Sequence, residues 1–241
     1  MAEIANLDFE SGDLTGFTST IVEAGNTLEA VAAALKDGSY GLRAIGGGTN
    51  DDCRGRIDLG ASTEAEIFCR FWFRLAGNQA VGGVVYPLVM SPDADAETGG
   101  FWGIRSHASD FTNRLFGYTG AAFETDPVLG AFDFTADTWY LMRVRVKIAT
   151  STTGEMDIWT STDGINFTLR YSQTDNNFGT SLIRYMRLGR DGNEAAGTFW
   201  FDSFIADNAA YPTEGGADPE GSLVHGKLVD GGLLAGGVLV G

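Results

Sequence analysis

Two segments of the chain alternate strictly between apolar and polar side chains. In residues 64–75 the odd-numbered positions from Ile67 onward are apolar, and the even-numbered positions include two arginines. Residues 138–148 repeat the pattern with apolar even-numbered positions, and the other side carries two arginines and a lysine. A period of two over this length predicts β-strands with one face in a core and one face in water.

Shorter segments of the same character follow one another along the chain, separated by turn signals such as KDGS, SPDAD and RDGN. Asp163-Gly164 between two such segments predicts a hairpin, since this pair accepts the positive φ angles of a type I′ turn. About a dozen strands without a helical period predict an all-β fold of two antiparallel sheets. The shorter predicted strands are residues 6–10, 40–45, 54–59, 84–90, 100–106, 113–118, 155–161, 167–173, 183–189 and 197–206.

Residues 26–38 (NTLEAVAAALKDG) give a mixed signal. Asn26 and Glu29 form a capping box, the following residues are strong helix formers, and Gly38 stands where a helix would stop. The next residues, SYGLRAI, have strand character, so both helix and strand stay open at residues 27–36 on local grounds.

The C-terminal residues differ in kind from the rest. Residues 1–211 form the predicted body, 212–222 a Gly- and Pro-containing linker, and 223–241 a Gly/Leu/Val-rich tail. Apolar pairs recur in the tail every five residues, a period that fits neither helix nor strand, and so short a segment cannot form its own core. We therefore expect docking or oligomerisation through Leu223, Val224, Leu228, Val229, Leu233, Leu234, Val238 and Leu239, with a flexible terminus as the alternative.

The net charge of the 241-residue chain is -16, from 32 acidic and 16 basic side chains. Such a surface repels a nucleic acid backbone, and the three lysines form no polybasic patch for a membrane. No apolar run is long enough to cross a bilayer, and the acidic N-terminus does not resemble a secretory signal. We expect synthesis in a cytoplasm without a signal peptide.

Cys53 and Cys69 are the two cysteines of the chain. Cys69 lies within a predicted strand, which favours buried free thiols over a disulfide, although the spacing permits either. With only His107 and His225 besides, the sequence offers no zinc-binding spacing.

Several motifs follow in a characteristic order: LDFESGDLTGF, AALKDGSYGLRA, the strand pair EAEIFCRFWFRL and TWYLMRVRVKI, GEMDIWTSTDGINFTL and GTFWFDSFIAD. Together they resemble the concanavalin A-like jelly-roll superfamily, in particular laminin-G-like domains of bacterial and bacteriophage proteins. The resemblance spans residues 7–207 and implies a two-sheet antiparallel jelly-roll sandwich. It also implies a strand at residues 28–35. Function does not follow from this fold, which serves lectins, glycanases, adhesins and virion proteins.

Glu155 and Asp157 resemble the start of the E-x-D-x-x-E catalytic strand of laminarinase-type glycoside hydrolases. A retaining hydrolase needs a nucleophile and a general acid about 5–5.5 Å apart. Thr160 occupies the position of the second glutamate and cannot protonate a leaving group. We therefore expect an ordinary hairpin strand with solvated acids, and no catalytic residues.

Sugar binding without catalysis is a further possibility, because sugar rings stack on aromatic side chains. Trp102 and Trp159 are the candidates for a surface platform. Trp139 and Trp200 lie in the strongest strand patterns and are expected in the core.

The resemblance also implies a calcium site where the first and last strands meet. The matching oxygens belong to Asp8, Glu10 and Asp202, and Ca²⁺ prefers six to eight such ligands. Solvated or turn-capping acids are the simpler interpretation.

These observations lead to the hypothesis of a virion structural protein of a bacteriophage, decorating the capsid or attached to the tail. The expected partners are other virion proteins and sister subunits, with glycans of a host surface as a further candidate. Neither nucleic acid nor a membrane is expected as a partner. The protein is not expected to be an enzyme. The alternatives are a carbohydrate-binding lectin or adhesin module and, third, a glucan hydrolase relative with an incomplete catalytic motif.

Overall fold

A computed structural model describes residues 3–47, 52–61, 63–77, 84–92, 100–106, 113–119, 132–149, 153–176, 181–191 and 197–212. The chain divides into two units, Met1–Tyr211 and Pro212–Gly241. Apart from Pro212, the linker and the eight predicted docking residues of the tail lie outside the described residues, so the expectation for them stays a prediction. Among the described residues no helix is long and apolar enough to span a membrane.

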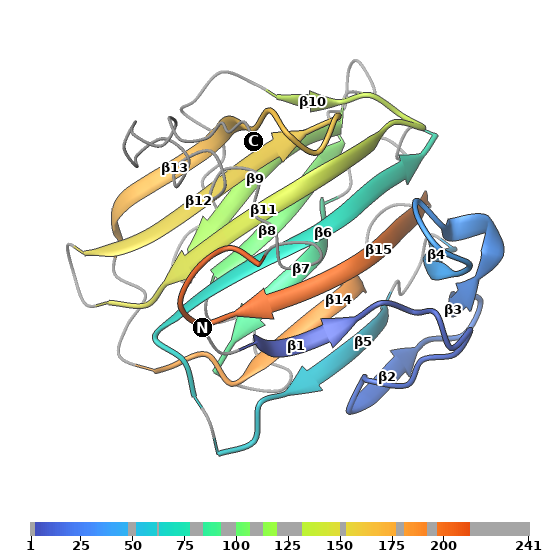
Figure 1. Cartoon of the computed structure of the whole chain (residues 1–241), viewed down its shortest axis with the longest axis horizontal. Coiled ribbons are helices and arrows are strands. Elements are labelled where there is room, and N and C mark those ends of the chain that lie inside the picture. Colours follow the sequence, from blue (N-terminus) through green and yellow to red (C-terminus); the bar gives the residue numbers. More distant parts are fainter. Residues whose placement is uncertain are drawn as a thin grey trace, which may run out of the picture. The chain divides into compact units, whose positions relative to one another are not determined.

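Eight strands form the larger of two antiparallel sheets (Figure 1). Its last strand, β15, lies inside the sheet, where it pairs with β6, β4 and β1. The spatial order is β13 (Thr168–Asn176), β12 (Gly154–Ser161), β11 (Trp139–Lys147), β6 (Glu66–Ala76), β15 (Gly197–Asp207), β4 (Gly41–Gly46) and β3 (Thr27–Val31), with β1 (Glu3–Leu7) beside β15.

Seven strands form the second sheet, which lies behind the first in Figure 1. The two stacked sheets make an all-β sandwich, which confirms the predicted fold class. The spatial order is β10 (Asp133–Phe134), β9 (Asn113–Thr119), β8 (Gly100–Ser106), β7 (Val84–Ser91), β14 (Tyr185–Asp191), β5 (Cys53–Asp58) and β2 (Ser19–Val22).

Alternation along the strands builds the core between the sheets. The apolar positions of residues 64–75 and 138–148 point inward, where they meet residues of the seven-stranded sheet such as Leu88 and Met186. Phe73 lies at the centre of an aromatic cluster, with ring centroids 5.4 Å from Phe134 and 5.5 Å from Phe199 and Phe201. The polar positions of the same strands are thereby placed on the outer faces.

The ambiguous segment 26–38 is resolved in favour of a strand followed by one tight turn. Strand β3 pairs with β4, and the three residues Ala32–Ala34 form a short 3₁₀ helix, η1. Only these three residues of the segment are helical, because pairing with β4 places residues 27–31 in the sheet. Strand β2 was missed, since the four residues STIV are too short to show a period.

The predicted hairpin at Asp163-Gly164 joins β12 to β13, but the connection is longer than a two-residue turn. Gly164 has the expected positive φ of 79°. The Asp163 carboxylate accepts hydrogen bonds from the Ser161 hydroxyl and from the amides of Ile165 and Asn166. These bonds, that from Asn166 foremost, lower the pKa of Asp163 and fix the loop.

Both cysteines are buried thiols that form no disulfide with each other, as the burial of Cys69 in a strand favoured. Cys53 lies in β5 and Cys69 in β6, so they belong to different sheets. Burial raises the pKa of the Cys69 thiol, which marks it as an inert core residue.

Candidate functional site

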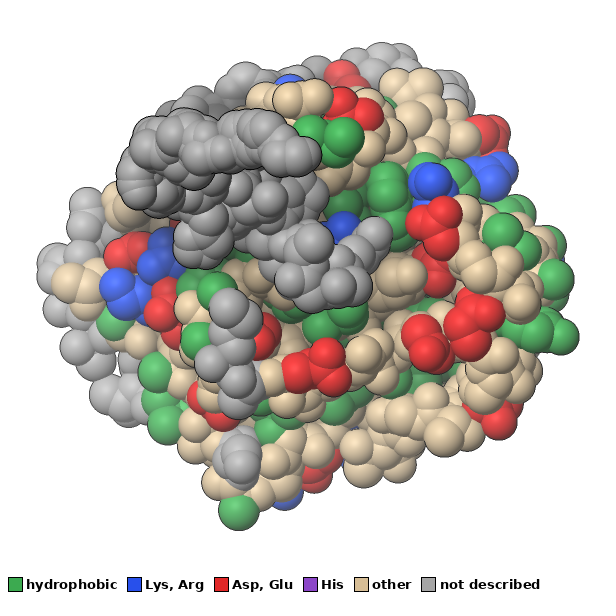
Figure 2. Space-filling view, in the orientation of Figure 1, with side chains coloured by type: hydrophobic (Ala, Val, Ile, Leu, Met, Phe, Trp, Pro, Cys, Tyr) green, Lys and Arg blue, Asp and Glu red, His purple; other side chains and the backbone are tan. Residues whose placement is uncertain are grey.

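Three segments of the same chain pack on the middle of the outer face of the eight-stranded sheet. The Lys36 ammonium lies 4.6 Å from the Trp72 ring centre. The guanidinium carbon of Arg143 lies 3.8 Å from the Phe167 ring and 5.3 Å from the Tyr211 ring. Trp72 and Arg143 are only 6% and 7% exposed, so the middle of this face is closed. Acidic side chains are spread over the described surface around it (Figure 2).

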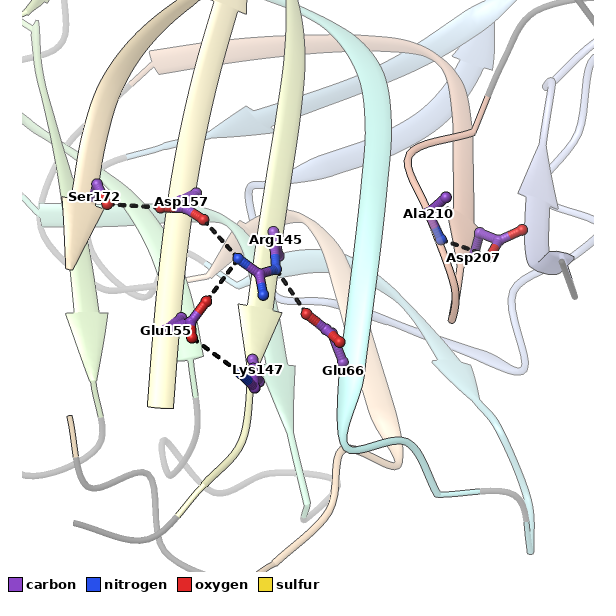
Figure 3. A network of polar contacts seen from close by, with 8 residues as sticks. All are labelled: Glu66, Arg145, Lys147, Glu155, Asp157, Ser172, Asp207 and Ala210. Atoms are coloured by element: carbon purple, nitrogen blue, oxygen red, sulfur yellow. Dashed lines mark hydrogen bonds and ion pairs between the residues drawn. The ribbon is translucent and has the colours of Figure 1, made fainter. Parts of the chain in front are cut away.

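A network of ion pairs lies on this face, across β6, β11 and β12 (Figure 3). Arg145 stands between three carboxylates, at 2.7 Å from Glu66, 2.7 Å from Glu155 and 3.1 Å from Asp157. Lys147 pairs with Glu155 at 3.0 Å. The two acids of the hydrolase-like motif are thus brought together with a third carboxylate, around a cation.

This arrangement does not supply a general acid. The hydrogen bond from Lys147 and the charge of Arg145 lower the pKa of Glu155, so its carboxyl is ionised near neutral pH. Thr160 is buried, and alternation along β12 places it on the inner face of the sheet. The network holds three strands together and offers no proton donor of the kind that glycoside hydrolysis needs.

The outer face of the seven-stranded sheet carries a cluster of arginines. Arg54 and Arg56 alternate with core residues along β5, and Arg187 of β14 is directly opposite Arg56 in the strand register. Arg187 is only 2% exposed, whereas Arg184, just before β14, has a side chain that is 43% exposed. Four guanidinium groups from β5, β14 and the residue before β14 are thus gathered on one face, together with the carboxylates of Asp52 and Asp58.

Tyr185 lies within this cluster. Its ring centre is 5.4 Å from the Arg56 guanidinium carbon and 4.9 Å from that of Arg184. Asp58 binds Arg184 through two contacts of 3.0 and 3.2 Å, which orients the guanidinium and lowers the pKa of Asp58. Arg54 pairs with Asp52 at 3.3 Å.

We refer to Arg54, Arg56, Arg184, Tyr185 and Arg187 as the arginine face. Guanidinium groups bind carboxylates and other planar anions through paired hydrogen bonds, most strongly where water is partly excluded. None of these residues is a site residue in the sequence-based prediction. The signal in the sequence that points to this face is CRGRID, residues 53–58. Its arginines occupy alternate positions, as they do in the segments 64–75 and 138–148.

The aromatic candidates fall in different places. Trp159 is half-buried on the outer face of the eight-stranded sheet, opposite Arg143. Trp102 lies in β8, and its side chain is outside the described residues. Trp139 and Trp200 are not in the core, and both are half-buried on the outer face. Each is directly opposite Arg74 of β6 in the strand register, and residues opposite each other point to the same face of a sheet.

The three acids proposed for calcium hold main-chain segments in place. Glu10 accepts hydrogen bonds from the amides of Ser39 and Tyr40, and these bonds lower its pKa. Asp202 accepts hydrogen bonds from the amides of Lys36 and Asp37 at 2.7 and 2.9 Å.

Asp8 is exposed, and its carboxylate accepts a hydrogen bond from the Glu10 amide. Within the described part of the chain, no group of three or more His, Cys, Asp or Glu side chains is placed to hold a metal ion. Calcium binding through Asp8, Glu10 and Asp202 stays a prediction.

No known family model and no curated protein matches this sequence. Solved structures do match the fold. The endo-β-1,4-glucuronan lyase of the fungus Trichoderma reesei is 14% identical, with a TM-score of 0.57 over 82% of this chain and 93% of that one. The cellulose induced protein Cip1 is 15% identical, with a TM-score of 0.61 over 86% and 99%. The PL-14 alginate lyase of Aplysia kurodai is 13% identical, with a TM-score of 0.56 over 86% and 100%.

These matches confirm the jelly-roll sandwich fold that the resemblance implies and give no support to its bacteriophage part. The fold is shared with polysaccharide lyases, so the hypothesis of a virion structural protein is wrong. The expectation that the protein is not an enzyme is contradicted as well, because three of the solved structures that share this fold are polysaccharide lyases. At these identities the matches establish the fold and carry no substrate over to this chain.

Proposed function

We propose that this protein is a carbohydrate-active β-sandwich protein that binds an acidic polysaccharide on its arginine face. The observation that carries the proposal is the cross-strand pair Arg56 and Arg187, with Arg54 and Arg184 beside it. In a chain of net charge -16, four guanidinium groups on one face are a strong local departure from the average. Guanidinium groups gathered in this way are suited to bind the carboxylates of such a polymer.

The chemistry of the matched proteins supports a sugar acid as that anion. Glucuronan and alginate, the polymers named for two of the similar structures, carry a carboxylate on every sugar. A guanidinium binds a carboxylate in a planar, two-bonded geometry that a neutral hydroxyl cannot reproduce. The half-exposed Arg184 and the partly exposed Arg56 are the groups of this face that a polymer reaches first.

Replacing Arg56 by Gln is expected to weaken binding of a uronic acid polymer about tenfold or more, since one charge-assisted contact is lost. The measurement is isothermal titration with alginate or polyglucuronate oligosaccharides. Raising the salt concentration should weaken wild-type binding too, because the interaction is between charges.

Arg170→Gln is the matched control, because Arg170 lies in β13 of the other sheet, hydrogen-bonded to Thr160. It should bind like the wild-type protein. The carboxyl-reduced form of the same polymer is the control ligand and should bind weakly to both proteins. Equal affinity of Arg56→Gln and wild type for the acidic polymer would refute the proposal.

Tyr185 favours a reaction on the same face, elimination of a uronate polymer. A base removes the proton next to the sugar carboxylate, the bond from the neighbouring ring carbon to the glycosidic oxygen breaks, a carbon–carbon double bond forms, and the leaving oxygen takes up a proton. Guanidinium groups neutralise the carboxylate and so stabilise the charge that develops beside it. The Tyr185 phenol, with Arg56 and Arg184 against its ring, is the group on this face that is suited to carry the proton.

This reaction predicts release of unsaturated sugars, detected by their ultraviolet absorbance when the protein is mixed with uronate polymers. Tyr185→Phe keeps the ring and removes the hydroxyl, so product release should fall at least about a hundredfold while binding persists. Absence of absorbance with wild-type protein on glucuronan, alginate and pectate would exclude the elimination and leave the binding proposal standing.

A further inference from the structure

A second surface with sugar-binding chemistry lies on the opposite sheet, where β6 ends and β11 and β15 begin. Trp139 and Trp200 are the neighbours of Arg74 in the strand register, one on each side. The three side chains therefore form one row across the outer face, which we call the tryptophan row. Basic and hydrophobic side chains lie side by side at the corresponding upper right of Figure 2.

The row is held rigidly by its own contacts. The guanidinium carbon of Arg74 lies 4.3 Å from the Trp200 ring centre and 5.9 Å from that of Trp139. Asp137 pairs with Arg74 at 3.0 Å, and its amide donates a hydrogen bond of 2.7 Å to the Leu75 carbonyl. Asp137 also has a positive φ of 62°, a conformation that is kept only where the surroundings enforce it.

The arginines in and beside the tryptophan row are paired with carboxylates. Arg74 is neutralised by Asp137, and Arg43, the next residue along the row beside Trp200, pairs with Glu29. The aromatic surface is thus offered without a net charge, in contrast to the arginine face. Its ligand is an uncharged molecule with apolar faces rather than an ion.

Elsewhere on this face, segments of the same chain pack on aromatic rings. Trp72 is covered by Lys36, and Phe68 by Tyr211 at 5.2 Å between ring centres. Trp139 and Trp200 are partly exposed, as are Phe68 and Trp159 on the same face.

The spacing of the two indoles fits an extended sugar chain. Trp139 and Trp200 lie two strands apart, or about 10 Å, since neighbouring strands are separated by ~4.8 Å. In an extended β-1,4-linked chain each sugar is turned over relative to the last, so the same ring face returns after two sugars, close to this distance. The exposed parts of both indoles can contact one chain, and Arg74 between them can donate hydrogen bonds to sugar hydroxyls.

We infer that the tryptophan row is a second carbohydrate-binding surface, specific for neutral β-1,4-linked glycans. It lies on the sheet opposite the arginine face and does not depend on the charge of a polymer. One molecule thereby contacts an acidic chain through one sheet and a neutral chain through the other.

The test is isothermal titration of the full chain with cellohexaose, a soluble neutral β-1,4-linked oligosaccharide. We expect Trp200→Ala and Trp139→Ala each to weaken binding about tenfold. Trp200→Phe retains a smaller ring and should lose less. Binding should not change with salt concentration.

Leu169→Ala is the matched control, since Leu169 is an exposed apolar side chain of the same sheet. It should bind like the wild type, and so should Arg56→Gln. Near-ultraviolet circular dichroism establishes that each variant is folded. No binding of cellohexaose by the wild type, or unchanged binding by folded Trp139 and Trp200 variants, overturns this inference. Binding of acidic polymers in the same variants reports separately on the arginine face.

Discussion

Phe73→Ala is expected to lower the free energy of unfolding by about 3–5 kcal/mol, because a large buried ring is replaced by a cavity. Phe73 is fully buried and touches three rings from two other strands, Phe134 of β10 and Phe199 and Phe201 of β15. The first of these strands belongs to the seven-stranded sheet and the last to the eight-stranded sheet. The substitution therefore weakens packing between the sheets, and a urea unfolding curve measures the loss.

Ile165→Ala serves as the comparison, since Ile165 is 59% exposed in the β12–β13 loop. It should change the unfolding free energy by no more than about 0.5 kcal/mol. A loss below about 1 kcal/mol for Phe73→Ala would show that the aromatic cluster repacks around the missing ring, against the rigid core described here.

Gly41→Ala is expected to cost about 3 kcal/mol for a different reason, overcrowding. A Cβ at Gly41 would lie 2.1 Å from the carbonyl oxygen of Ala34 and 2.9 Å from that of Phe201. Both obstacles are main-chain atoms, one in η1 and one in β15, so neither can rotate away. A urea unfolding curve measures this loss as well.

Gly77→Ala separates crowding from backbone strain. Gly77 has a φ of 71°, and a Cβ there would meet nothing within 4 Å. Its substitution should cost only about 1 kcal/mol, the strain of a left-handed residue. Equal losses at the two positions would contradict the steric explanation for Gly41.

The strands could be predicted from the sequence where the alternation of apolar and polar residues continues over a long segment. Strands β6 and β11 begin and end within two residues of the predicted segments, because eleven and nine residues of alternation leave one consistent assignment. Segment 26–38 was not decidable locally, since its pairing partner β4 lies beyond it in the chain and decides the outcome. Strand β10 has two residues and no pattern to detect.

The site was harder to predict than the fold. The arginine face joins β5 to β14, and nothing in the sequence reveals that residues 53–58 and 185–191 are neighbours. The net charge of the chain was also a poor guide, because a total of -16 does not show that four arginines are gathered on one face. For Trp139 and Trp200, alternation favoured the outer face and hydrophobicity favoured the core. The alternation along the strands predicted the positions of both tryptophans correctly, and their hydrophobicity did not.

The position of β15 inside the eight-stranded sheet has a consequence for synthesis. A growing chain completes β1, β4 and β6 early, yet the strand that all three pair with emerges only after about two hundred residues. Until then the edges of β4 and β6 stay open, a condition that favours pairing with other chains. Folding therefore depends on contacts between residues far apart in sequence, which makes it slow and places it after, rather than during, translation of the sandwich.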